Sequence, residues 1–332
     1  MIAGKNRWTL DGLGVGLASL VVVSLTLGHA SFTRENPSPI VKPCYAFLLS
    51  GDVWLNCAGD RQRVTQGGDV DDFAADSSGR ALAIERYKST RAVVDGRVYF
   101  QPSPTSIELL SPMSGEVLAS SRAKPYGKLV SSCGTILEIS QDPSIGDWLG
   151  LTRDLLQDKW LAFSPYRNFR CSSDRDNIVG LTNPDHLALM FGTPPRELAE
   201  PKRPPLLYDI SPAGNFVAYF ADSTLCATES GAPKCLPEVD AFGRISVSDS
   251  GEVLLATHTD GGCYYKDEWH ASEKPRPDYE GEDQCIAVAS WKPGRPTIEV
   301  LEPLARDPQW LTQKAASTLM EWGRRQQRVT QR

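Results

Sequence analysis

The sequence predicts an all-β protein with one helix at its C-terminal end, and two patterns carry this prediction. A short phrase recurs through the middle of the chain: an apolar strand enters a small or acidic turn that closes on glycine, and a second apolar strand follows. Apolar residues recur convincingly at helical spacing only near the end of the chain.

The composition narrows the class of protein. The chain has 332 residues, of which 41% are hydrophobic and 23% charged, as in ordinary globular proteins. Only the apolar run near the N-terminus approaches membrane length, so a protein with several membrane spans is excluded. The net charge is -6 and the basic residues are spread along the chain, so we expect no nucleic-acid partner.

The first 30 residues have the three parts of a secretory signal peptide. Lys5 and Arg7 precede an apolar stretch over 13–27, and small residues at Gly28 and Ala30 suit cleavage after Ala30. We therefore expect residues 1–30 to be removed from a periplasmic or secreted protein. The alternative is an uncleaved N-terminal membrane anchor, with the protein facing outside the cytoplasm. Residues 31–43, which contain three prolines, read as a linker.

Eight cysteines follow the signal and agree with export. An even number of cysteines in an exported chain predicts structural disulfides. These are Cys44, Cys57, Cys133, Cys171, Cys226, Cys235, Cys263 and Cys285. The spacing contains no Cys-x-x-Cys, so zinc and redox chemistry are disfavoured and we predict no metal or cofactor.

Local geometry suggests two of the pairs. A predicted hairpin around Ser50-Gly51 places Cys44 opposite Cys57, at a separation that a disulfide spans. Cys226 and Cys235 flank a turn-rich stretch and form a second local pair. Sequential pairing then leaves Cys133 with Cys171 and Cys263 with Cys285, and the spacing alone does not fix these two.

The recurring phrase has the period of a propeller blade. Its closing residues are Gly79, Gly134, a position near 176, Gly214, Gly251 and Gly294. Their mean spacing is about 43 residues, and periods of about 40–45 residues with several strands each are typical of β-propeller blades. We predict about six four-stranded blades over residues 44–304. The alternative is a pair of β-sandwiches, which the short strand spacing also allows.

The turn phrase resembles a known repeat. Ser211-Pro212-Ala213-Gly214 and the strand after it look like the Ser-Pro-Asp-Gly phrase of TolB-type, WD-like β-propeller repeats, and Val64-Thr65-Gln66-Gly67-Gly68 resembles the segment that precedes it there. The resemblance implies a ring used for protein interactions, often in the periplasm. It supplies no catalytic residues to carry over.

Residues 305–332 are expected to form an amphipathic helix with a basic tail. Asp307 suits the N-cap and Pro308 the first helical position of a helix over 307–329. Trp310, Leu319 and Trp322 lie on its apolar stripe. We expect this stripe to pack on the propeller rim, with docking to a partner or membrane surface as the alternative.

The search for chemistry gives no predicted catalytic residue. Asp69, Asp71 and Asp72 form an acidic cluster that could bind calcium, but turn solvation explains it better. His258, close to Asp260, reads as a surface pair. The sequence therefore predicts an exported, non-enzymatic binding scaffold for a protein or envelope component. The alternative is a propeller hydrolase or lyase that acts on a glycan or peptide through paired carboxylates.

Overall fold

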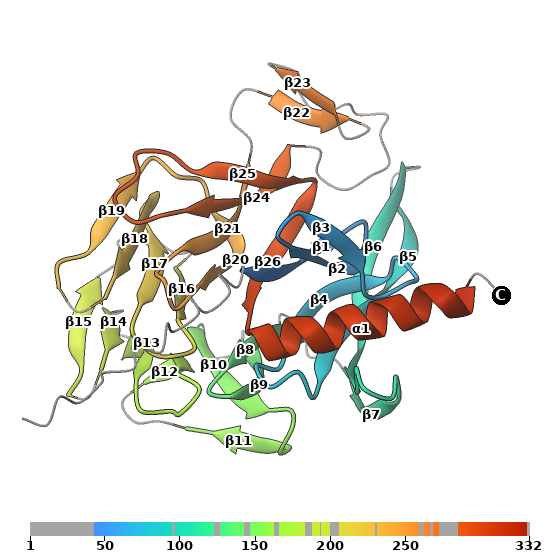
Figure 1. Cartoon of the computed structure of the whole chain (residues 1–332), viewed down its shortest axis with the longest axis horizontal. Helices are drawn as coiled ribbons and strands as arrows, with labels where there is room; N and C mark the ends of the chain where they lie inside the picture. Colours follow the sequence, from blue (N-terminus) through green and yellow to red (C-terminus); the bar gives the residue numbers. More distant parts are fainter. Residues whose placement is uncertain are drawn as a thin grey trace, which may run out of the picture. The chain divides into compact units, whose positions relative to one another are not determined.

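The protein is a ring of six four-stranded antiparallel sheets, the blades of a β-propeller (Figure 1). The structure, a computed structural model, describes residues 43–330 except 95–96, 123–126, 143–146, 163–165, 183–187, 193, 200–205, 230, 259–261, 266–267 and 272–284. The predicted signal peptide and nearly all of the predicted linker lie outside these residues. Among the residues that are described, no helix combines the length and the apolar character needed to cross a membrane.

The four strands of each blade follow one another from the propeller axis outwards. Blade 1 contains β26 (Ala305–Leu311), β1 (Cys44–Leu49), β2 (Asp52–Cys57) and β3 (Asp60–Arg63). Blade 2 contains β4 (Val70–Ala75), β5 (Leu82–Val94), β6 (Arg97–Leu110) and β7 (Val117–Ser121). Blade 3 contains β8 (Gly127–Ser132), β9 (Thr135–Asp142), β10 (Asp147–Asp154) and β11 (Lys159–Leu161).

The remaining blades repeat this order. Blade 4 contains β12 (Arg167–Cys171), β13 (Ile178–Thr182), β14 (Ala188–Phe191) and β15 (Arg196–Ala199). Blade 5 contains β16 (Leu207–Ile210), β17 (Val217–Ala221), β18 (Thr224–Thr228) and β19 (Lys234–Pro237). Blade 6 contains β20 (Phe242–Val247), β21 (Val253–His258), β24 (Ile286–Trp291) and β25 (Glu299–Pro303), and the hairpin of β22 (Gly262–Tyr265) and β23 (Glu268–Ala271) is inserted after β21.

The ring closes through its two ends. The last strand, β26, pairs antiparallel with the first, β1, from Cys44 opposite Leu311 to Leu49 opposite Ala305. Figure 1 shows this as a red strand beside a blue one. Neighbouring blades then bury their apolar faces against each other, as Leu55 and Phe73 do between blades 1 and 2. The predicted sandwich pair is thus excluded, and the predicted propeller is confirmed.

Four of the predicted turn glycines lie in equivalent turns. Gly79, Gly134, Gly214 and Gly251 each connect the innermost strand of a blade to the next strand and have φ of 72°, 67°, 77° and 80°. A side chain is excluded at Gly134, where a Cβ would lie 2.7 Å from the carbonyl oxygen of Ser173. Glycine therefore closes these turns because positive φ and close packing coincide there.

The third and last copies of the phrase, near residue 176 and at Gly294, differ from the expectation. In blade 4 the positive φ falls on Arg175, at 70°, and no glycine closes the turn. Gly294 also has positive φ, 94°, but it lies between β24 and β25, the third and fourth strands of blade 6. The innermost strand of blade 1 is β26. The chain continues from β26 into the C-terminal helix and not into the next strand of the blade, so β26 has no such turn.

The predicted helix start at Asp307 is wrong. Residues 305–311 form β26, so the propeller continues beyond the predicted boundary at 304. The helix α1 spans Gln313–Thr330, and its N-cap is Thr312, whose Oγ1 accepts the N–H of Ala315 at 3.2 Å. Pro308 is tolerated in β26 because the register with β1 is irregular there and the inner edge of the strand is unpaired.

Helix α1 packs on the propeller, as expected for its apolar stripe. Leu319 and Trp322 join the core between blades 1 and 2. The Gln62 side chain donates to the carbonyl of Met320 at 2.8 Å, and Arg325 donates to the carbonyls of Pro112 and Met113 at 2.6 Å each. These contacts fix the helix over the turns of blades 1 and 2.

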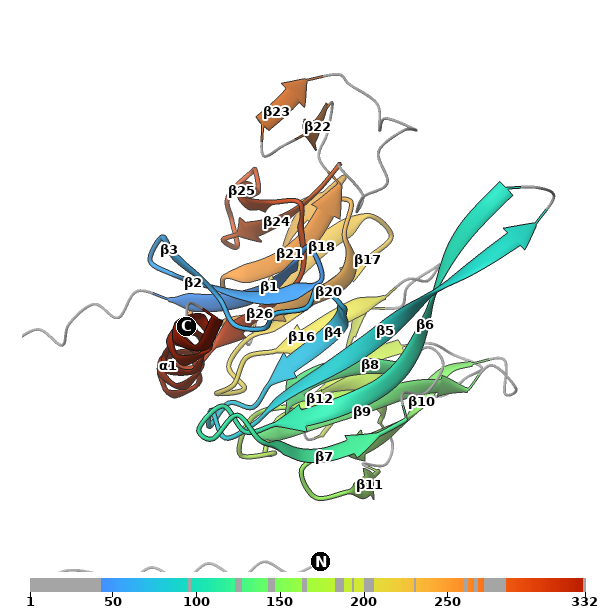
Figure 2. The same ribbon diagram turned by 90° about the vertical axis from the view of Figure 1, so that its right-hand side faces the viewer.

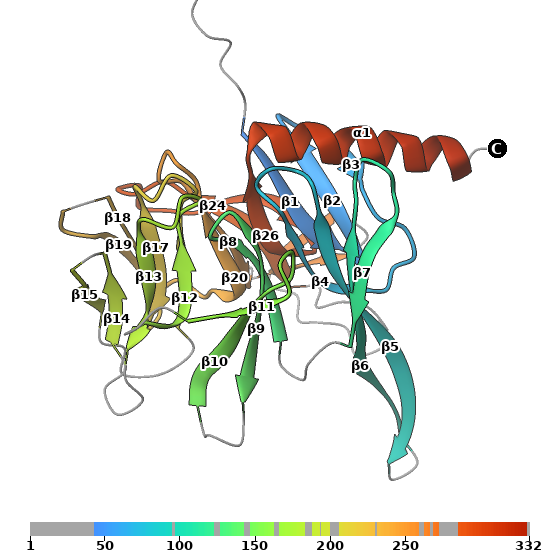
Figure 3. The ribbon, with the colours of Figure 1, turned by 90° about the horizontal axis from the view of Figure 1, so that it is seen from below.

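The two faces of the propeller differ. One face carries the short turns and α1. At the opposite face β5 and β6, of 13 and 14 residues, continue as a two-stranded ribbon beyond blade 2 (Figure 2). The β9–β10 hairpin projects in the same direction (Figure 3). Long connections that project from one face of a rigid scaffold are typical of a binding surface.

Candidate functional site on the propeller axis

Side chains connect all six innermost strands to one another around the axis. An innermost strand pairs on one side only, so its other edge presents unpaired N–H and C=O groups. Each neighbouring pair is bridged by one side chain that bonds to the backbone of the next strand. The bridging residues are Gln309 (β26 to β4), Asp72 (β4 to β8), Ser132 (β8 to β12), Tyr208 (β16 to β12), Asp209 (β16 to β20) and Ser246 (β20 to β26).

An ionisable residue from every blade also faces this axis. The group consists of Asp307 in blade 1, Asp72 in blade 2, Lys128 in blade 3, Arg170 in blade 4, Asp209 in blade 5 and Arg244 in blade 6. Electrostatic interactions join these residues across the ring. We call them the axial cluster.

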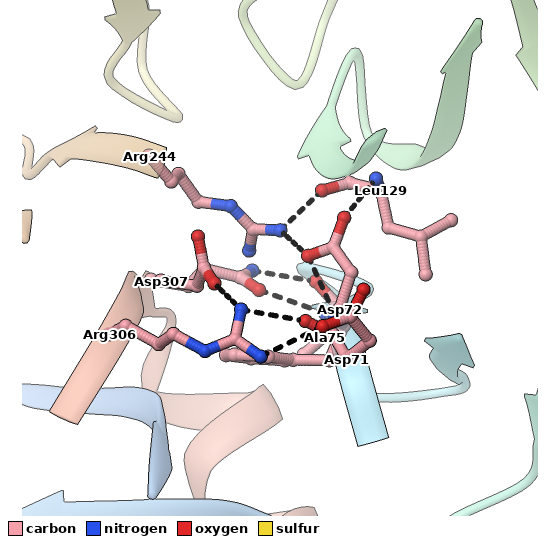
Figure 4. A network of polar contacts seen from close by, with 9 residues as sticks. Asp71, Asp72, Ala75, Leu129, Arg244, Arg306 and Asp307 are labelled. Atoms are coloured by element: carbon pink, nitrogen blue, oxygen red, sulfur yellow. Dashed lines mark hydrogen bonds and ion pairs between the residues drawn. The ribbon is translucent and has the colours of Figure 1, made fainter. Parts of the chain in front are cut away.

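Arg244 crosses the axis and connects three blades (Figure 4). Its Nη2 donates to Asp72 Oδ1 and to the carbonyl oxygen of Leu129, both at 2.5 Å. The guanidinium lies over the ring of Phe73, 5.3 Å from the centroid. The other terminal nitrogen, Nη1, is buried and has no hydrogen-bond partner. Arg244 therefore holds blade 6 against blades 2 and 3 and keeps one donor unused.

Asp72 is held as a carboxylate. Oδ2 accepts the N–H of Leu129 at 2.7 Å, and Oδ1 accepts the N–H of Phe73 at 2.8 Å in addition to Arg244. Burial raises the pKa of Asp72, while Arg244 and Lys128 act in the opposite direction. Because all of these contacts donate hydrogen to its oxygens, the ionised form fits the site.

Arg306 forms the second ion-pair group beside the axis. It donates to Asp71 Oδ1 at 2.9 Å and to Asp307 Oδ2 at 2.7 Å. Burial alone would raise the pKa of Asp307, but Lys128, Arg306 and Arg244 hold that pKa below its usual value. Figure 4 shows the two arginines side by side, each paired with aspartate from β4 or β26.

Asp209 of the axial cluster and Glu85 in β5, opposite Asp72, have strongly raised pKa values. Burial raises the pKa of Asp209 to about 6, even though the N–H of Val247 and the charge of Arg170 oppose the shift. Burial, with Asp72 and Asp71 adding negative charge nearby, raises the pKa of Glu85 to about 8. With Glu85 protonated, the axial cluster together with Asp71 and Arg306 contains as many acidic as basic charges.

A small cavity occupies the axis at the end that carries the short turns. Its volume is about 40 Å³, which has room for only a few water molecules. All six blades line it, through Gln309, Ala75, Ser132, Cys171, Ile210 and Ser246 among others, and Ala315 of α1 also contributes. The cavity thus lies where all six blades and α1 meet.

The structure separates the acidic residues that the sequence grouped as a calcium candidate. Asp69 pairs with Arg86, Asp71 with Arg306 and Asp72 with Arg244. Each carboxylate thus points to a different arginine. Within the described part of the chain, no group of three or more His, Cys, Asp or Glu residues is arranged to hold a metal ion.

The other predicted residues are placed as follows. Disulfides join Cys44 to Cys57, Cys133 to Cys171 and Cys226 to Cys235, and Cys285 is also disulfide-bonded. The side chain of Cys263, its expected partner, lies outside the described residues, as does Asp260. His258 pairs with Asp240, at 2.6 Å between Nδ1 and Oδ2, and both side chains are about half exposed.

The axial cluster was missed at the sequence level. Its members come from separate segments, and no local motif joins them. One signal was present: Asp72, Lys128, Arg170, Asp209 and Arg244 each stand two or four residues before the first residue of a turn. Since side chains alternate along a strand, both spacings place the side chain on the same face.

Comparison with known proteins agrees with this architecture. Neither a family model nor a curated protein matches the chain. Among solved structures, TolB from Acinetobacter baumannii superposes with a TM-score of 0.53 at 12% identity, over 81% of this chain and 66% of that one. The fold is a TolB-type β-propeller. The chain spans just under two thirds of the length of that TolB.

A second solved structure is similar at a lower level. It is the β-propeller domain of Cps50 (Swd1) from Myceliophteria thermophila, with a TM-score of 0.41 at 10% identity, over 79% of this chain and 82% of that one. At these identities the TolB-type likeness concerns the fold.

Proposed function

We propose that the protein is an exported, non-enzymatic binding scaffold, and that a protein or envelope component is recognised on the face that carries the long hairpins. The observation that supports this proposal most directly is the difference between the two faces of the propeller. One has short turns covered in part by α1, whereas β5 and β6 extend beyond blade 2 at the other. An extended ribbon offers backbone and side-chain groups to a partner without disturbing the ring.

The disulfides support an exported location. Three pairs are formed and a seventh cysteine, Cys285, is also disulfide-bonded, and such bonds persist in oxidising compartments. Together with the signal-like segment over 1–30, they favour the periplasm or the exterior. A mass measurement on the purified protein tests this: loss of residues 1–30 supports a soluble exported protein, and retention supports an anchored one.

The geometry of the axis disfavours the hydrolase or lyase alternative. A glycosidase of the usual kind needs two carboxyl groups facing a cleft that admits the sugar. Asp72 and Glu85 are opposite each other in the β4–β5 register, but their exposed fractions are 4% and 5%. Both carboxyls are therefore buried, and that of Asp72 is bonded to Arg244 and to two backbone N–H groups.

Partner capture with a shortened ribbon tests the scaffold proposal. The variant replaces residues 88–103 by an Asn-Gly turn, which leaves the Tyr87–Pro104 pair and the blade intact. We expect a partner recovered by cross-linking from envelope extract with the native protein to be lost with this variant. Ser317→Ala, on the opposite face, is the control and should retain it. Equal recovery with the ribbon variant, or efficient turnover of a glycan or peptide, would contradict the proposal.

A further inference from the structure

The outermost strand of blade 2, β7, is an unprotected sheet edge. Among the described residues, the outermost strand of each of the six blades pairs on one side only. Folded proteins block such edges with charged residues or proline, because an open edge otherwise pairs with another chain. The outermost strands of the other five blades follow this rule. Each contains at least one charged residue: Asp60 in β3, Lys159 in β11, Arg196 in β15, Lys234 in β19 and Glu299 in β25.

By contrast, β7 has the sequence Val-Leu-Ala-Ser-Ser and contains neither a charge nor a proline. Its residues are exposed over nearly the whole strand. Val117 is 55% and Leu118 53% exposed, and Met113 in the preceding turn is 64% exposed. These are three of the five large apolar residues exposed in the described chain, so apolar surface is concentrated at this edge.

Charges immediately flank the strand, and their spacing is self-complementary. Glu116 precedes β7 and Arg122 follows it, and both are exposed. Ala119 lies midway between them. If two copies of β7 pair antiparallel about a two-fold axis at Ala119, Glu116 of each copy faces Arg122 of the other. Val117 then faces Ser121, and Leu118 faces Ser120.

We propose that β7 is a homodimer interface, in which two copies of this chain join their second blades into one continuous antiparallel sheet. The two ion pairs fix the register, since opposite charges placed directly across a sheet are favourable and like charges unfavourable. At the start of β7 the N–H of Ser111 donates to the carbonyl of Glu116 at 2.8 Å, which keeps Glu116 in line with the sheet. The surface is isologous, as a two-fold dimer requires.

Charge reversal tests the register by sedimentation of the protein as isolated. Glu116→Arg alone and Arg122→Glu alone each place like charges opposite one another twice per dimer, and each should weaken dimerisation about tenfold or more. The double variant Glu116→Arg with Arg122→Glu restores both pairs and should restore the dimer. Both residues are exposed, so none of these variants should alter folding.

Cysteine cross-linking tests the position of the two-fold axis. Ala119→Cys places two thiols opposite each other at a distance that a disulfide spans, so a covalent dimer should form under oxidising conditions. Ser120→Cys is the matched control, because Ser120 faces Leu118 of the other copy. A protein that stays monomeric at hundreds of micromolar overturns the proposal. So does a dimer indifferent to the charge reversals, or attachment of a different protein at position 119 in place of a second copy.

Discussion

At the scale of single residues, Arg244 is the side chain on which the axis most depends. Its removal leaves Asp72 buried without its counter-charge and frees the carbonyl of Leu129. Arg244→Met should therefore lower the free energy of unfolding by about 3–5 kcal/mol, measured by urea denaturation. Lys292→Met is the control, since Lys292 is largely exposed and lies 3.8 Å from Glu252, so loss of this ion pair should cost less than about 1 kcal/mol. Equal losses for the two variants would refute this role.

Glu85 should make stability depend on pH near neutrality. Its pKa rises from 4.5 in the unfolded chain to about 8 in the folded one, so the native state binds more protons between these values. The free energy of unfolding then falls as pH increases through this window and levels off above about pH 8. Glu85→Gln should flatten the decline between pH 6.5 and 8.5 in urea unfolding experiments.

The matched control for Glu85 is Asp209→Asn. The pKa of Asp209 rises only to about 6, so Asp209 changes the stability mainly at pH values below about 6.5. This variant should keep the slope of the native protein between pH 6.5 and 8.5. An identical slope for Glu85→Gln and the native protein would show that Glu85 does not bind a proton on folding.

At the scale of elements, the helix α1 contains a glycine whose replacement should destabilise it. Alanine is normally better than glycine in a helix by about 0.5–1 kcal/mol. At Gly323, however, a Cβ would lie 2.8 Å from the carbonyl oxygen of Arg63 and 2.6 Å from Nε2 of Gln62. Gly323→Ala should therefore lower the free energy of unfolding by about 1–3 kcal/mol. Ser317→Ala, on the exposed side of α1, should be neutral or slightly stabilising, and a gain in thermal stability from Gly323→Ala would contradict the close contact.

The elements that depend on nearby residues could be predicted from the sequence, and those that depend on distant pairing could not. The Cys44–Cys57 register follows from one two-residue turn, and the structure has that register. The residues that follow Asp307 resemble the start of a helix when read locally. They belong to β26, whose pairing partner β1 lies more than 250 residues earlier, and no local sequence pattern indicates this pairing. The side chain of Asp307 accepts a hydrogen bond from Arg306 and does not cap a helix.

The axial cluster could not be predicted from the sequence for the same reason. Each member is an ordinary charged residue in a mostly apolar strand, and only the closed ring brings them together. Glycine at the turns could be predicted because positive φ is a local requirement. The side-chain bridges between innermost strands could not, because each joins segments from different blades.

At the scale of the whole molecule, stability should depend on ring closure more than on the helix. A chain that ends after Leu311 keeps β26 and all six blades but loses the buried side chains of Leu319 and Trp322. We expect it to fold, with a lower thermal midpoint. A chain that ends after Pro303 lacks β26, so blade 1 has no innermost strand and Arg244 loses its neighbours in β26. We expect no cooperative thermal transition by circular dichroism for this shorter chain. A sharp transition in both would contradict the prediction.

The pairing of β26 with β1 also determines when the ring can close during biosynthesis. The ribosome makes three strands of blade 1 first and the fourth only after every other blade. Until then the growing polypeptide has an incomplete N-terminal sheet with β1 unpaired on one side, open to wrong partners. The ring therefore cannot close until β26 has been made, and a chaperone that shields β1 during that interval would raise the yield of native protein.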